Sequence, residues 1–181
     1  MTVPAPPGMR VEFRPLREAD LTVLARWLST PEWIRWWAPA IPLEEVRAKY
    51  LPRIEGEDPV NGFVVVVDGR AVGYIQWYRV SDHPDVTAVF GLDDDRAEVT
   101  AGIDFGIGEP DMTGHGHGRT ILARFVEDVV LRAPGIATCV VDPDPDNERA
   151  VRCYRAAGFV ERGVVVDGQT GEHWMLMEWA G

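Results

Sequence analysis

The chain has 181 residues, of which 46 % are hydrophobic, and its formal net charge at pH 7 is −11. That length suits one well-buried core, so we expect a single domain over residues 9–181 behind a flexible, proline-rich leader over residues 1–8. The acidic balance excludes nucleic-acid binding through phosphates, which needs a basic face. No stretch approaches the roughly 20 uncharged apolar residues of a membrane helix, so we expect a cytoplasmic protein that does not bind membranes.

In chain order, the first half of the sequence predicts a strand, two helices and two further strands. The segments are strand 11–14, helix 21–28, helix 43–50, strand 63–67 and strand 72–78. Both helices show apolar residues at helical spacing, and Pro52 is expected to close the second one. The tryptophan cluster between them is interrupted by prolines and is expected in a loop or a short helix. Asp68-Gly69 is typical of a two-residue turn, and it predicts a hairpin.

The second half predicts a strand, a glycine-rich turn and two helices between further strands. An irregular acidic stretch is expected over 81–97, followed by strand 99–107, helix 121–130, strand 137–141, helix 147–158, strand 160–166 and strand 173–179. Asn147 is expected to cap the second of these helices, and Asp167-Gly168 to form the last turn. The order β-α-α-β-β-β-α-β-α-β-β predicts an α/β fold, a mixed sheet with helices on its faces.

The cysteines and histidines predict neither a disulfide nor a metal site. Cys139 and Cys153 lie in apolar, regularly patterned segments without CxxC spacing, so we expect reduced core thiols. The four histidines are not paired with cysteines at ligand spacing.

The glycine-rich turn between strand 99–107 and helix 121–130 is the first indication of a ligand. Glycines let a backbone approach a ligand closely, and the start of a helix directs N–H groups and the positive end of its dipole outward. An anion such as a phosphate fits there, although a purely structural turn explains the glycines as well. The spacing lacks GxxxxGKS/T and GxGxxG, which excludes the usual nucleoside triphosphate and dinucleotide loops.

Two segments together resemble the GNAT superfamily of N-acetyltransferases. Residues 113–118, Thr-Gly-His-Gly-His-Gly, are similar to its Q/R-x-x-G-x-G/A loop, which binds the coenzyme A pyrophosphate, with Thr113 at the Q/R position. Residues 147–159 are similar to its second signature, N-x-x-A-x-x-x-Y-x-x-x-G-F. The resemblance runs from about residue 9 to residue 179. It implies the GNAT fold, a mixed, mostly antiparallel central sheet flanked by helices, and acetyl-CoA as the cofactor.

Within the superfamily, the chain looks most like the aminoglycoside 6′-N-acetyltransferases. The likeness rests on Trp36-Trp37, on Gly102-Ile103-Asp104 and on the DPDPDN segment over 142–147. It implies an enzyme that acetylates the 6′-amine of an aminoglycoside and so confers antibiotic resistance. In that family the aspartate of the GID segment acts on the amine and the aspartate opening the DPxPxN segment contacts the sugar amines. These roles fall on Asp104 and Asp142.

The catalytic residues implied by the resemblance are Asp104 and Tyr154. An amine attacks a thioester only as the free base, and Asp104 is placed to hold the ammonium and accept its proton. Tyr154 is implied near the departing sulfur, where a phenol can protonate or hydrogen-bond the thiolate. The structural alternatives are a solvent-facing Asp104 and a core tyrosine at position 154.

The cofactor is expected to contact backbone groups that pair with pantetheine, the glycine loop and the start of the following helix. The residues are Phe105, Gly106, Ile107, Gly114, His115, Gly116, His117, Gly118, Arg119, Thr120 and Asn147. Asn147 is either a partner of the pantetheine amides or only a helix cap.

The acceptor is expected to be a small cationic amine held by carboxylates and aromatic side chains. The residues are Trp36, Trp37, Asp93, Asp94, Asp95, Asp142 and Asp144. The tryptophans stack on sugar rings or plug the core, and the carboxylates form an acidic cleft or only keep the protein soluble.

Two other functions fit the same motifs. One is a siderophore-type N-acyltransferase acting on a lysine or hydroxylysine side chain, and the other is a non-catalytic domain that only binds coenzyme A. In each case we expect a monomer or a homodimer.

Overall fold

The computed structural model describes residues 8–168 and 170–181. Apart from Gly8, the expected leader over 1–8 lies outside the described residues. The chain divides into two compact units. The N-terminal unit comprises residues 8–76 and 104–115, and the C-terminal unit comprises 77–103 and 116–181.

Within residues 8–168 and 170–181, seven strands pair in the order β1-β2-β3-β4-β5-β7-β6. β1 and β2 are antiparallel, β4 and β5 are parallel, and β7 is antiparallel to both β5 and β6. This is the predicted fold class, a mixed and mostly antiparallel sheet with helices beside it. The strands are β1 (Val11–Pro15), β2 (Asn61–Val67), β3 (Arg70–Arg79), β4 (Thr100–Ile107), β5 (Thr138–Val141), β6 (Phe159–Val166) and β7 (His173–Trp179).

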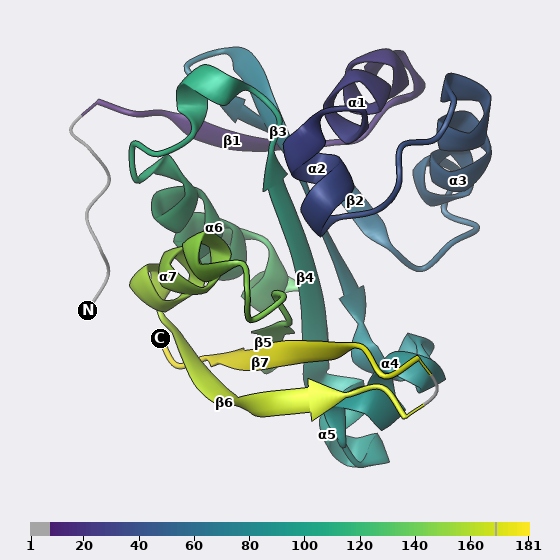
Figure 1. Cartoon of the computed structure of the whole chain (residues 1–181), viewed down its shortest axis with the longest axis vertical. Helices are drawn as coiled ribbons and strands as arrows, with labels where there is room; N and C mark the ends of the chain where they lie inside the picture. Colours follow the sequence, from purple (N-terminus) through teal and green to yellow (C-terminus); the bar gives the residue numbers. More distant parts are fainter. Residues whose placement is uncertain (1–7, 169) are drawn as a thin grey trace. The chain divides into compact units, whose positions relative to one another are not determined.

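In the described part of the N-terminal unit, three helices pack with β2 and β3 around one hydrophobic core. They are α1 (Leu21–Leu28), α2 (Pro31–Trp36) and α3 (Leu43–Glu55), drawn in purple to blue in Figure 1. The side chains of Leu24, Trp27, Tyr50, Val64 and Tyr74 in this core are almost completely buried. The apolar faces of the helices and the β-branched residues of the strands therefore pack together in one cluster.

Two local predictions in this unit had different outcomes. The hairpin is confirmed, because Asp68 and Gly69 adopt φ angles of 50° and 82°, the left-handed values of a type I′ turn. The prediction that Pro52 closes the second helix is wrong, because α3 continues to Glu55 and ends at Gly56 with a φ of 79°. Proline removes one N–H donor but keeps its carbonyl, and here that carbonyl accepts from the backbone of Glu57 at 2.8 Å.

In the C-terminal unit, α6 (His117–Asp128) and α7 (Glu148–Ala157) lie side by side next to β5, β6 and β7 (Figure 1). Both helices are amphipathic, and their buried faces include Ile121, Phe125 and Tyr154. Phe159 and Met177 of the strands are also buried. The predicted helices and strands of this unit are thus present.

The prediction of an irregular stretch over 81–97 is wrong. This part of the chain contains two short helices, the second of which extends to Val99. They are α4 (Pro84–Phe90) and α5 (Asp94–Val99). Proline at the first position starts α4 and Gly91, with a φ of 64°, ends it. Asp93 caps α5 by accepting from the backbone of Arg96 at 2.8 Å. β4 therefore begins at Thr100, one residue later than expected.

The last turn is longer than the predicted Asp167-Gly168 pair. β6 ends at Val166 and β7 begins at His173, and the backbone of Asp167 donates to the Glu172 carbonyl at 2.8 Å. The part of the chain that the structure describes also contains four single turns of 3₁₀ helix: Glu18–Asp20, Val80–Asp82, Pro110–Met112 and Val130–Arg132. Among the described residues, no helix has both the length and the apolar character needed to cross a bilayer.

Candidate functional site

Asp104 lies half-buried on β4 and is held by a buried glutamine of the neighbouring strand. Gln76 of β3 is 8 % exposed and donates from Nε2 to Oδ2 of Asp104 at 2.6 Å. The Oε1 of the same amide accepts from the Tyr74 hydroxyl at 2.9 Å and from Nη1 of Arg53 at 2.7 Å. Sequence reasoning singled out Asp104 but not Gln76. The signal for Gln76 was a lone amide in an otherwise apolar strand.

Charged and phenolic groups of α3 and β3 surround Asp104. Burial is the main cause that lowers the pKa of Lys49, and repulsion from Arg53 adds to it, while attraction to Asp104 opposes it. Burial also raises the pKa of Tyr50 and the pKa of Tyr74, so both phenols stay protonated at neutral pH. The candidate base therefore shares its surroundings with two basic side chains and two neutral phenols.

A tryptophan that sequence reasoning did not assign to the site supports this part of β4. The indole of Trp33 donates to the Ile107 carbonyl at 3.0 Å. A side chain at Gly106 would place its Cβ 2.5 Å from the same indole, so glycine is required there. Trp37 stacks at a tilt on Trp33 with a centroid distance of 4.8 Å, while the Arg35 guanidinium lies 4.4 Å from the ring centre of Trp36. Trp37 thus packs against core side chains, as one of the two predicted roles for the tryptophans requires.

The end of β4 is bulged and held by a buried carboxylate. The backbone amides of Gly108 and Glu109 both donate to the Val72 carbonyl, at 2.8 and 3.2 Å. Two consecutive residues therefore pair with a single residue of β3, as in a β-bulge. The Glu109 carboxylate accepts from the Trp27 indole at 2.9 Å, from Arg70 at 2.8 Å and from Arg26. The bond from Trp27, followed by those from the two arginines, lowers the pKa of Glu109, so this carboxylate stays ionised at neutral pH.

The glycine-rich turn leads into α6 without a side-chain cap. Gly114 and Gly116 have φ angles of 80° and 76°, and Gly116 is the N-cap of α6. No acidic residue lies in the first turn, which instead carries the exposed Arg119. Carboxylates are favoured at a helix N-terminus and cations are not, so this end suits an anion supplied from outside. His117 and Gly118 open the helix, and Thr120 within it is buried, 2 % exposed. Gly114 and His115 belong to the N-terminal unit, and the rest of the turn belongs to the C-terminal unit.

The α7 helix begins and ends as predicted. Asn147 caps it by accepting from the backbone of Ala150 at 3.1 Å. Tyr154 is 8 % exposed and packs edge-on against Phe159 with a centroid distance of 5.7 Å. Burial raises the pKa of the neighbouring Cys153 thiol to about 11, so this thiol is protonated at neutral pH.

The acidic residues predicted for the acceptor have different surroundings. Asp94 and Asp95 are exposed in the first turn of α5, and the Asp93 carboxylate caps that helix. Asp142 follows β5 and is half-buried, while Asp144 is exposed and accepts from the backbone of Asp146 at 2.8 Å. Asp142 is therefore the least exposed carboxylate of the set.

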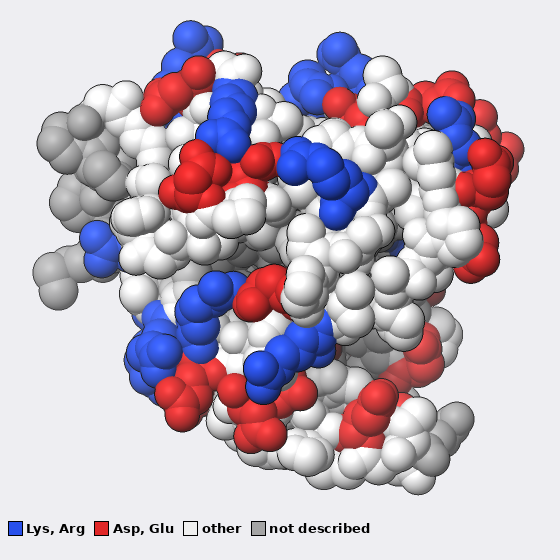
Figure 2. Space-filling model, turned by 45° about the horizontal axis from the view of Figure 1, so that its top comes forward, with Lys and Arg blue, Asp and Glu red and all other residues white. Residues whose placement is uncertain are grey.

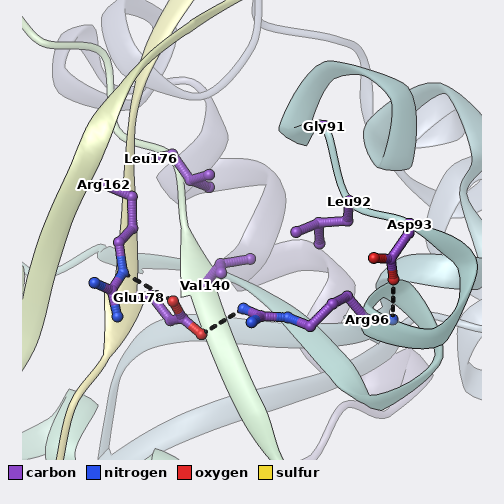
Figure 3. A pocket seen from close by; sticks show the side chains of 8 residues that line it. All are labelled: Gly91, Leu92, Asp93, Arg96, Val140, Arg162, Leu176 and Glu178. Atoms are coloured by element: carbon purple, nitrogen blue, oxygen red, sulfur yellow. Dashed lines mark hydrogen bonds and ion pairs between the residues drawn. The ribbon is translucent and has the colours of Figure 1, made fainter.

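A pocket of about 330 Å³ lies beside Asp93 in the C-terminal unit (Figure 3). Glu178 of β7 lines it and accepts from Arg96 at 2.9 Å and from Arg162 at 2.8 Å. The other lining residues are Gly91, Leu92, Val140 and Leu176. Two arginines and two carboxylates line this pocket, so it does not concentrate negative charge.

Acidic and basic side chains are also interspersed over the molecular face drawn in Figure 2, where red and blue atoms lie next to one another. Within the described residues, no cluster of three or more histidine, cysteine, aspartate or glutamate side chains could hold a metal ion.

Comparison with known proteins identifies related enzymes. The family described as "Acetyltransferase (GNAT) domain" matches residues 17–166. The aminoglycoside N(6′)-acetyltransferase type 1 of Klebsiella pneumoniae is 30 % identical over 158 residues, which cover 86 % of this chain and 76 % of that protein. A solved structure of AAC(6′)-Ib with coenzyme A and kanamycin is 27 % identical and superposes with a TM-score of 0.77, covering 94 % of this chain and 95 % of the other. A second structure of AAC(6′)-Ib, with ribostamycin and coenzyme A, has 26 % identity, a TM-score of 0.78, and covers 94 % and 93 % of the two chains.

Proposed function

Since this chain belongs to the GNAT acetyltransferase family and is an acetyl-CoA-dependent N-acetyltransferase, we propose that it acetylates the 6′-amine of an aminoglycoside. The observation that carries the proposal is Asp104 on β4, a half-buried carboxylate held by the amide of Gln76. The related enzymes named above act on or are bound to aminoglycosides, which supports this acceptor class.

Asp104 is the proposed general base. An aminoglycoside amine is mostly protonated at neutral pH, so the carboxylate first binds the ammonium and then accepts its proton, directly or through water. When bound, acetyl-CoA supplies the acetyl group as a thioester. The free amine forms the new C–N bond, the C–S bond breaks, and the thiolate takes up a proton. We assign Tyr154 to the departing sulfur, as a phenol that donates a hydrogen bond or that proton.

The chain's residues fit coenzyme A at two places. At the start of α6, first-turn amides without a side-chain cap would hold the pyrophosphate, together with Arg119 and the glycines of the turn. Backbone groups of Phe105 and Gly106 would pair with pantetheine like an added strand. Ile107 has a smaller part there, because its carbonyl already accepts from Trp33.

For the acceptor, we assign Asp142 the main contact with the sugar amines. It is half-buried, so its charge is less screened by water than that of the exposed Asp94, Asp95 and Asp144. Asp93 contributes less, since its carboxylate is already used as a helix cap. Trp36 is the tryptophan we assign to a sugar ring, because Trp37 packs against Trp33 and Tyr74.

The test is a thiol-release assay with acetyl-CoA and a panel of amines. We expect turnover of aminoglycosides that carry a 6′-amine and none of a matched aminoglycoside with a 6′-hydroxyl. Polyamines, lysine and hydroxylysine derivatives complete the panel. Thiol release with lysine derivatives alone would identify the siderophore-type acyltransferase, and calorimetric binding of coenzyme A without turnover of any amine would identify the non-catalytic domain.

A further inference from the structure

The amide of Gln76 has only one orientation that satisfies its neighbours. A guanidinium has donors and no acceptor, and Arg53 meets this amide from one side at 2.7 Å. Burial keeps the Tyr74 phenol protonated, so it is a second donor on the same side. The carbonyl oxygen of Gln76 must therefore face Arg53 and Tyr74, and its NH₂ group must face Asp104.

Arg53 is itself fixed, so the orientation does not depend on a mobile side chain. Its side chain is only 12 % exposed, and its Nε approaches the Asp58 carboxylate at 3.4 Å. Its guanidinium lies 4.9 Å from the centre of the Tyr50 ring. Because a flipped or absent amide would leave a buried donor or acceptor unsatisfied, the structure favours a single arrangement.

We propose that Gln76 is the positioning residue for Asp104: its amide, oriented by Arg53 and Tyr74, fixes the plane of the carboxylate that accepts the proton of the acceptor amine. This inference rests on the proposed function, because it assigns Asp104 the role of base. Gln76 itself does not contact the reacting atoms in this assignment. A bond to the charged form of Asp104 also favours that form, so the amide keeps the base ionised.

The groups that face Asp104 set the expected pH dependence. They include Lys49, Tyr50 and Arg53 of α3, and Tyr74 and Gln76 of β3. Arginine stays protonated, the glutamine amide does not titrate, and burial raises the pKa of both phenols, so none of these four groups changes charge between pH 4 and 7. Asp104 must be ionised to accept a proton, so activity falls as the pH drops through the pKa of this carboxyl. A variant that stabilises the ionised carboxylate less raises that pKa, and the fall in activity then occurs at higher pH.

The experiment compares two replacements of Gln76 of similar size. Gln76→Met removes the donor, and we expect the acidic limb of kcat/KM for the acceptor to move up by about one pH unit, with kcat roughly tenfold lower. Gln76→Glu can still pair with Arg53 but places a second carboxylate against Asp104. It should move the limb further, because like charges disfavour ionisation. KM for acetyl-CoA should stay unchanged in both.

Glu109→Gln is the matched control, because it alters another buried polar network of the N-terminal unit. It should lower the melting temperature and leave the acidic limb in place. If both Gln76 variants fold and keep the wild-type limb and kcat, Gln76 has no positioning role. A limb that moves equally in Glu109→Gln would contradict the proposal as well, because the effect would then follow stability alone.

A second readout separates this inference from the function on which it rests. The Asp104 carboxyl can be titrated by ¹³C NMR without any acceptor, with Asp104→Asn for assignment. Its pKa should rise from wild type to Gln76→Met and again to Gln76→Glu. If no amine is acetylated but this order appears, the proposed function fails and the positioning contact stands. If amines are acetylated but the order is absent, only the inference fails.

Discussion

Single residues of the candidate site differ in how far the sequence could predict them. The GID segment pointed to Asp104, because a motif can mark a residue without any knowledge of its neighbours. Gln76, Arg53 and Trp33 could not be assigned in this way, since each acts through a partner that is far away in the sequence. Their roles depend on tertiary contacts, which a pattern of apolar and polar residues does not specify.

Asp104→Asn should lower turnover by roughly 10²–10⁴, the usual contribution of a general base. Asparagine keeps an oxygen that can accept from Gln76, so the fold should be retained. Steady-state kinetics with the best acceptor measure the loss, and calorimetry with acetyl-CoA should show unchanged affinity. Near-normal turnover would mean that Asp104 is not the general base.

Secondary-structure elements were predicted best where the local sequence alone determines the backbone. The Asp68-Gly69 turn needs two residues that tolerate positive φ, and both are adjacent. The helices α4 and α5 were missed because each is short, with seven and six residues, so neither shows an apolar pattern over more than two turns. Their starts at Pro84 and Asp93 were nevertheless readable as proline at the first position and as an aspartate cap. The position of β7 between β5 and β6 involves pairing partners distant in sequence, which no local pattern reveals.

At the start of α6, the glycine turn gives a test with a matched control. Gly116 and Gly56 adopt nearly the same left-handed φ, 76° and 79°, and both border a helix. Replacing either by alanine should destabilise the fold by about 1 kcal/mol, because a Cβ disfavours this conformation.

Only Gly116→Ala should also weaken acetyl-CoA binding, since only that turn is assigned to the pyrophosphate. Thermal unfolding checks the shared effect, and calorimetry checks the specific one. Equal affinity of the two variants for acetyl-CoA would mean that the turn at Gly116 does not bind the cofactor.

At the scale of the whole molecule, the formal net charge of −11 attracts a cationic acceptor. On the face drawn in Figure 2 acidic and basic side chains lie next to one another, and the half-buried Asp142 is the residue that we assign to bind the acceptor at one place.

For a polycationic acceptor, KM should rise with ionic strength, because added salt screens attraction between exposed charges. KM for acetyl-CoA, which is anionic, should not rise in the same way. Asp142→Asn should flatten the salt dependence for the acceptor. Asp128→Asn removes the same charge from the far end of α6 and should leave the slope unchanged. Identical slopes in the two variants would mean that the carboxylates act only through net charge.

The place of β7 in the sheet also has a consequence for biosynthesis. β7 comes after β6 in the chain but lies between β5 and β6, and it is antiparallel to both. Until residues 173–179 have left the ribosome, β6 lacks its neighbouring strand, and the site later filled by the fully buried Met177 is open. The C-terminal unit can therefore close only after translation of residues 173–179. A nonsense codon within residues 173–179 should therefore be as damaging as one in the middle of the chain.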